Sequence, residues 1–372
     1  MVLLLFVAGS LWFSGQTPVY RLFRSGSGAH VCYDRAVVLQ VKQETLNPPS
    51  GNGVITGSQD ISIRILSGEK AGAIQNIRNY LNYTTNFRLK AGNHIIVRVD
   101  IANQDFYLVN FYSIDREPAL YGLALLFFAL LCAVGGTKGF RSIPGIIITF
   151  AGFIFLFVPL LYRGFPPVAS AMLIAALTVS ASLLFMAGLN TKTVSAVLGA
   201  LVGLIVSAVI AFIFQYLLEV SGYTSSDADY LFSIADHTGM KLGELLFASI
   251  VISSLGAVMD ISISIASVIN EVHSVNPALG VAGLFRSGMN VGRDIAGMMS
   301  NTLILAFVGA GFNVLVTVQC LNYSFLQILN SNTIIIDMIQ AFSGSMAVIL
   351  TAPATSLITA LLIIRKPLEK RP

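Results

Sequence analysis

Long apolar stretches fill most of the chain after residue 118, with short polar gaps between them. About seven of these stretches approach or exceed the roughly 20 residues that an α-helix needs to cross a bilayer. They cover residues 120–134, 143–161, 168–188, 194–218, 242–268, 295–318 and 342–364. A shorter apolar stretch at residues 2–13 is interpreted as a residual signal anchor. The pattern predicts a polytopic α-helical membrane protein with about 7–8 transmembrane helices.

The pattern changes to short alternations between residues 25 and 117. Apolar and polar residues alternate along 61–65 and 97–101, and β-rich stretches occupy 36–41 and 106–112. A period of two residues is typical of β-strands. About five short strands predict a small β-barrel-like domain near the N-terminus, of an OB-like kind. We expect this domain to be a spacer, a docking platform for a protein or a gate cover, in preference to a small-ligand site.

These patterns divide the chain into four parts. Residues 1–24 form a short N-terminal signal anchor and linker, 25–117 the extracytoplasmic β-rich domain, 118–364 the multipass helical membrane domain, and 365–372 a basic cytoplasmic tail. With 55% hydrophobic residues, 11% charged residues and a mean hydropathy of +0.79, the chain is too apolar for a soluble globule.

Basic residues gather in the loops that this arrangement places inside the cell. Those loops hold Lys138, Arg141, Lys192, Arg286 and Arg293, and the tail is basic as well. The positive-inside rule therefore predicts a cytoplasmic C-terminus.

The stretch at 242–268 and the residues that follow it carry polar groups at helical spacing. Ser253, Asp260, Ser264, Ser267 and Glu271 follow one another by steps of seven, four, three and four, which places them on one helical face. Asp260 lies roughly 16 Å from Glu271 along such a helix, and hence near the bilayer midplane. Because a charged residue in lipid is costly, we expect Asp260 to face the interior of the helical bundle.

The next apolar segment repeats this pattern. Asn290, Asp294, Gly297 and Asn301 share one face, and Arg293 lies beside them at the expected cytoplasmic boundary. The glycines around residues 289–293 predict a broken or re-entrant element there. One interpretation is a permeation or proton path lined by Asp260, Asp294 and Asn301. The other is that buried polar pairs merely hold the helices together.

Candidate transport-path residues from both segments are Asp260, Ser264, Glu271, Asn290, Arg293, Asp294 and Asn301.

Small residues elsewhere favour packing over chemistry. Gly199, Gly203 and Ser207 predict a close-packing helical face. The small residues of 343–355 are interpreted either as a packing face, which we favour, or as a hinge or third wall of the path, with a kink at Pro353.

Signatures of catalysis and of cofactor binding are missing from the sequence. It contains no HExxH, Walker A or GxSxG motif, and Cys32, Cys132 and Cys320 match no metal spacing. We therefore expect no enzyme, no cofactor, no bound metal and no nucleic acid partner. The expected partners are the lipid bilayer, a small solute or cation, and an extracytoplasmic protein.

Three motifs resemble those of a known family. GAVMDISISIAS at 256–267, SGMNVGRD at 287–294 and NTLILA at 301–306 are similar to segments of the YibE/F-like family of bacterial multipass membrane proteins. The resemblance extends over about residues 120–364. It implies the cytoplasmic membrane of a bacterium and carries no assigned activity. The positions that match the family motifs are Asp260, Asn290, Gly292, Arg293, Asp294 and Asn301.

Two functional hypotheses follow from these observations. The leading one is a secondary transporter or exporter with a polar intramembrane path that is coupled through Asp260, since a carboxylate near the midplane can alternate between protonated and charged forms. The competing one is a membrane scaffold or sensor whose outer β domain binds a partner.

Overall fold

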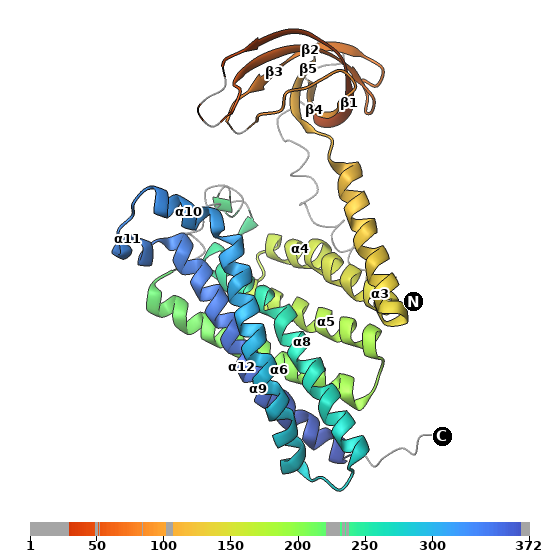
Figure 1. The fold of residues 1–372 in the computed structure, drawn as a ribbon, viewed down its shortest axis with the longest axis vertical. Coiled ribbons are helices and arrows are strands. Elements are labelled where there is room, and N and C mark those ends of the chain that lie inside the picture. Colours follow the sequence, from red (N-terminus) through yellow and green to blue (C-terminus); the bar gives the residue numbers. More distant parts are fainter. Residues whose placement is uncertain are drawn as a thin grey trace. The chain divides into compact units, whose positions relative to one another are not determined.

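The computed structural model describes residues 30–48, 51, 53–83, 85–101, 107–220, 231–232, 235 and 238–365. It divides into two compact units, one formed by residues 18–134 and the other by residues 135–372 together with 1–17 (Figure 1). The predicted signal anchor at 1–24 lies outside the described residues, as does the tail after Arg365.

The unit formed by residues 18–134, named the outer unit after the location predicted for it in the sequence analysis, is built on a single antiparallel sheet of five strands. The strands are β1 (His30–Leu46), β2 (Gly57–Ile65), β3 (Ile74–Leu81), β4 (His94–Ile101) and β5 (Tyr107–Ile114), in the order β3-β2-β1-β4-β5. The period-two prediction is confirmed, because Ile61, Ile63 and Ile65 of β2 are fully buried on one face of the sheet. Val97 and Val99 of β4 are buried in the same core.

The sheet curls into a half-barrel (Figure 1). Strand β1 pairs with both β2 and β4, and its register against β2 shifts between Val38 and Gln40 and again between Val41 and Gln43. Such irregularities bend a strand and increase its twist. The edge strands β3 and β5 meet through Gln75, whose Nε2 donates a hydrogen bond to Tyr107 Oη at 2.7 Å. The prediction of a small β domain is thus confirmed at the level of a curved five-stranded sheet.

Two buried amides hold the segment between β3 and β4 against this sheet. Gln59 Nε2 donates to Leu89 O at 3.0 Å, and Leu89 N donates back to Gln59 Oε1 at 2.9 Å. Asn79 Nδ2 donates to the same Gln59 Oε1 and to Phe87 O. Because these side chains are buried, the hydrogen bonds satisfy backbone groups that water does not reach.

The second unit consists of long apolar helices. They are the end of α3 (Glu117–Gly152), followed by η1 (Phe153–Phe157) and α4 (Val158–Tyr162), then α5 (Pro167–Ala187), α6 (Thr191–Leu218), η3 (Leu242–Glu244), α8 (Leu245–Val275), α9 (Val281–Ala310), α10 (Phe312–Cys320), α11 (Phe325–Leu329) and α12 (Asn332–Arg365). Among the described residues, 5 helical segments are long and apolar enough to cross a membrane, or up to 6 if the bent pair α9 and α10 forms one span. The protein is therefore an α-helical membrane protein, while the predicted number of about 7–8 spans is not confirmed.

Two chain breaks account for differences from the predicted spans. The stretches 120–134 and 143–161 fall in one helical run, Glu117–Tyr162, which is interrupted at Gly136 with φ 54° and ψ −135°. The predicted break at residues 289–293 is wrong, because α9 is continuous there and the chain instead bends by 58° between α9 and α10.

Close packing explains the glycines within α9 that suggested a break. A Cβ on Gly288 would lie 2.6 Å from Ile269 Cδ1, and one on Gly292 would lie 3.1 Å from Ala352 Cβ. These glycines therefore admit neighbouring helices at short range while the α9 backbone stays helical.

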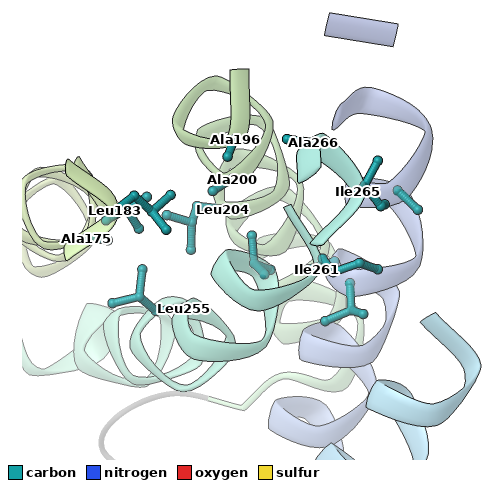
Figure 2. Packing of buried hydrophobic residues seen from close by; sticks show 14 of the residues in the cluster. Ala175, Leu183, Ala196, Ala200, Leu204, Leu255, Ile261, Ile265 and Ala266 are labelled. Carbon is teal, nitrogen blue, oxygen red and sulfur yellow. The ribbon is translucent and has the colours of Figure 1, made fainter. Parts of the chain in front are cut away.

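The core of the helical unit is made of small and branched apolar residues from α5, α6, α8, α9 and α12. Figure 2 shows Ala175 and Leu183 of α5 with Ala200 and Leu204 of α6 and Ile261 of α8.

The predicted close-packing face of α6 is confirmed. A Cβ on Gly199 or Gly203 would collide with Thr355 or Thr351 of α12. Ser207 Oγ lies 3.0 Å from Ser254 Oγ of α8, within hydrogen-bonding distance.

Candidate functional site

The candidate site lies on a hairpin formed by α8 and α9. Helix α8 ends at Val275. In the turn that contains Pro277, Asn276 Oδ1 accepts a hydrogen bond from Ala278 N at 3.3 Å. Gly280 is extended at φ −75° and ψ 177°, and α9 begins at the next residue. The two helices pack antiparallel, with Gly288 opposite Ile269 and Gly292 opposite Ile265 (Figure 1).

Helix α8 has one buried face and one polar exposed face. Val258, Ile261, Ser262 and Ile265 are buried against the other helices. The predicted polar stripe lies on the opposite side, where Asp260 and Glu271 are exposed and Ser264 is half-buried. The spacing therefore identified a common face, but the expectation that Asp260 faces the bundle interior is not met within the single chain.

Helix α9 repeats this division. Its buried residues are Leu284, Gly288, Gly292 and Ala296. Its exposed residues include Arg286, Asn290, Arg293, Asp294, Gly297 and Asn301. Six of the seven candidate residues are thus exposed on their helices, away from the buried faces, and Ser264 is half-buried.

The structure gives the positions of the mid-helix charges along α8 and α9. Asp260 is the central residue of α8 (Leu245–Val275). Helix α9 begins at Val281, although its apolar stretch begins only at residue 295. Arg293 therefore lies roughly 18 Å from the start of α9, near the centre of the helix and next to the start of its apolar stretch.

The register between α8 and α9 places Asp260, Arg293 and Asp294 at similar levels along the hairpin. Because Gly292 lies opposite Ile265 in an antiparallel pair, Arg293 is level with Ser264, about one helical turn from Asp260. Asp294 lies between these two levels. One basic and two acidic side chains thus occupy a narrow band at the centre of the hairpin.

This band has no electrostatic partner within the described part of the chain. None of the ion pairs found there includes Asp260, Arg293 or Asp294. A charged side chain at the centre of a membrane helix costs roughly 2.5 to 3.5 kcal/mol on insertion scales. The arrangement therefore requires water, a proton, an ion or another polar surface at this face.

The charge balance of the band has a chemical consequence. Two carboxylates and one guanidinium give the band an excess of one negative charge when all three side chains are ionised. Within the regions that the structure describes, no group of three or more His, Cys, Asp or Glu side chains is arranged to hold a metal ion.

Asp337 is a further carboxylate in the helical unit that the sequence patterns did not predict as a site residue. Asp337 of α12 lines a cavity of about 210 Å³ whose other walls include Phe307, Val314 and Met338. A Cβ on Gly311 would lie 2.8 Å from Asp337 Oδ2, so the carboxylate reaches the bend between α9 and α10. The last apolar stretch of the sequence begins at residue 342, whereas α12 begins ten residues earlier, at Asn332. The run Ile334–Ile335–Ile336 before Asp337 is the signal that extends the helix back to this residue.

The outer unit has a concavity of about 740 Å³ lined by Arg35, Ser67, His94 and Asp115 among others. Next to it, Asp34 is buried beside Gly68, where φ is +79°. Burial raises the pKa of the Asp34 carboxyl. A hydrogen bond from Ser67 opposes this shift, and the charge of Glu69 adds to it.

Comparison with known proteins places the helical part in a family. The family model described as YibE/F-like protein matches residues 123–365. No curated protein and no solved structure matches the chain. The matched region contains all seven candidate residues.

Proposed function

Because the chain belongs to the YibE/F-like protein family, whose matched region holds the polar hairpin, we propose that it is a secondary transporter or exporter. In this proposal, α8 and α9 line a polar path through the membrane, and Asp260 is the carboxylate that couples movement to a proton or cation. The transported species is a small solute or cation.

One observation carries this proposal. Asp260, Arg293 and Asp294 lie near the centres of the neighbouring long helices α8 and α9, on exposed faces and without an ion-pair partner in the described chain. Ionisable residues in the middle of membrane helices occur mainly where ions, protons or substrates pass. Charges that served only to hold the helices of one chain together would instead lie between those helices.

The proposed mechanism uses the unequal number of acids and bases. Arg293 balances one carboxylate throughout the cycle. Asp260 binds a proton or a cation when the path is open to one side and releases it when the path is open to the other. The amides of Asn290 and Asn301, on the same face of α9, supply uncharged polar contacts for the solute along the path.

The proposed location is the cytoplasmic membrane of a bacterium, with the C-terminus in the cytoplasm. The turn between α8 and α9 then faces the cytoplasm, as does the basic end of α12. In this proposal the β-rich domain is extracytoplasmic. A cysteine at the cytoplasmic end of α8, such as Ser274→Cys, is expected to react with an impermeant maleimide only in inverted vesicles.

Asp260→Asn tests the coupling role, because it retains shape and hydrogen bonding but removes titration. The purified protein is reconstituted into liposomes that contain a pH-sensitive dye, and a sodium or potassium gradient is imposed. We expect the wild-type protein to move protons and Asp260→Asn to lose at least ~90% of that rate, a factor of ten that corresponds to about 1.4 kcal/mol.

Glu271→Gln is the matched control, since it makes the same chemical change near the end of α8. Its rate is expected to stay within about twofold of the wild-type rate. Proton movement by Asp260→Asn at the wild-type rate would show that Asp260 is not the coupling group.

A scaffold or sensor is the second candidate function. It is favoured by the concavity of the outer unit and by Tyr33 and Tyr112, two exposed aromatic rings whose centroids lie 4.8 Å apart. Exposed aromatic residues are frequent in protein interfaces. If the wild-type protein moves no ion, and Tyr33→Ser with Tyr112→Ser abolishes a stoichiometric complex, this second function replaces the first.

A further inference from the structure

The polar face of the α8–α9 hairpin has the composition of a helix interface but meets no helix of its own described chain. Gly256 and Gly297 lie on this face, and a Cβ on either glycine would meet nothing within 4 Å. A Cβ on Gly203, Gly288 or Gly344 would instead collide with atoms of neighbouring helices. The space beside Gly256 and Gly297 is therefore open in the described chain.

We propose that this face is the contact surface between two copies of the chain, related by a twofold axis. In such a contact, the same surface of each copy meets the other, so it must be complementary to itself. The exposed faces of α8 and α9 contain both signs of charge within about one helical turn in depth, since Arg293 is level with Ser264 and Asp294 lies between that level and Asp260. Arg293 of one copy can therefore meet a carboxylate of the other while the reverse contact forms on the other side of the axis.

The small residues of the face fit close approach between the copies. Gly256 and Asp260 lie one turn apart on α8, and the antiparallel register places Gly297 level with Asp260. Glycines at such positions allow the backbones of two membrane helices to approach, and polar side chains beside them form hydrogen bonds across the contact. Lipid tails satisfy neither the charges nor the amides.

Another segment of the same chain is a poorer occupant of this surface. The apolar segment at residues 2–13 contains no charged side chain, so it can neutralise none of the three charges. An unrelated membrane protein would need a separate complementary charge pattern, whereas a second copy already has it. The proposed dimer contact is inferred from helix geometry and charge. It does not depend on whether the protein transports a solute or ion.

Cross-linking tests the contact in native membranes. Cys32, Cys132 and Cys320 are first replaced by serine, and Gly297→Cys is introduced on the polar face. The matched control is Val209→Cys, on the 53% exposed residue of α6. With a short bis-maleimide we expect at least about five times more covalent dimer for Gly297→Cys than for Val209→Cys.

A second measurement counts copies in lipid nanodiscs by mass photometry. The wild-type protein is expected to contain two copies. Asp260→Leu with Arg293→Leu and Asp294→Leu is expected to contain one, because the face then matches lipid. Should this triple variant fail to fold, Gly297→Leu serves in its place, since it obstructs the contact without touching the chain's own core.

Three results would overturn the proposal. They are a single wild-type copy per nanodisc, a triple variant that remains dimeric, and cross-linking of Gly297→Cys to a different protein in place of a second copy. The transport assay separates this inference from the proposed function. Dimers that move no ion reject transport alone, and monomers that move ions reject the interface alone.

Discussion

The two units of the molecule distribute their polar groups in opposite ways. In the outer unit, ion pairs such as Arg78–Asp60 and Arg88–Glu44 lie on the surface, and the buried amides of Gln59 and Asn79 are hydrogen-bonded. In the helical unit, the buried polar groups are mostly hydroxyls, such as that of Ser262, which donates to Val258 O of its own helix. Its mid-helix charges are exposed and have no partner in the described chain.

The exposed α8–α9 face is the surface whose charges lack partners within the described chain. Unpaired charges in water are hydrated and cost little, and exposed ion pairs add little stability. In hydrocarbon the same unpaired charges are expensive. The outer unit therefore pairs many of its charges on its own surface, whereas the helical unit needs something beyond the chain at the α8–α9 face.

The largest expected effect separates the two faces of α9. Gly288→Leu inserts a side chain where Ile269 and Ser356 already pack, so it should destabilise the helical unit by about 3 kcal/mol and lower the yield of folded protein in detergent. A Cβ at Gly297 meets no atom of the chain within 4 Å, so Gly297→Leu should leave the yield of folded protein in detergent unchanged. Equal loss of folded protein in both variants, measured by size-exclusion chromatography, would break the distinction between a core face and an open face.

An intermediate effect is expected in the interior of the outer unit. Gln59→Leu preserves the volume but leaves the N–H and C=O of Leu89 without partners, which should cost about 2–3 kcal/mol. Hydrogen exchange in segment 85–90 of the full-length protein should accelerate correspondingly. Gln43→Leu on the exposed side of β1 is the control, and a similar acceleration there would contradict the role of the buried amide.

The smallest effect concerns Asp34 and pH. Since burial raises its pKa in the folded protein, the protonated form is favoured there. Its contribution to stability is greatest below the unfolded pKa of 3.8 and is lost as pH rises through the raised folded value. Asp34→Asn should remove this dependence and increase the protection of β1 and β2 at neutral pH. Hydrogen exchange corrected for its intrinsic pH dependence measures this, and an unchanged pH profile in the variant would exclude Asp34 as the source.

Local patterns were sufficient for several elements of the fold. The alternation along β2 and β4 predicted strands because a buried sheet face selects every second residue. The helical spacing around Asp260 and Asn290 predicted one polar face per helix for a similar reason. The apolar stretches identified membrane helices, although Asp337 was missed and the start of α9 was placed too late because polar residues lie inside these helices.

The sequence by itself determined the membrane class, the strands, the polar face of each helix and the central position of Asp260. These features follow from residue periodicity and from the energetic cost of charge in lipid, both of which act locally. The tertiary structure alone decided which way the polar faces point. The direction of each polar face depends on which side of α8 and of α9 packs against α12. Those contacts, such as Gly292 of α9 with Ala352 of α12, join residues far apart in the sequence.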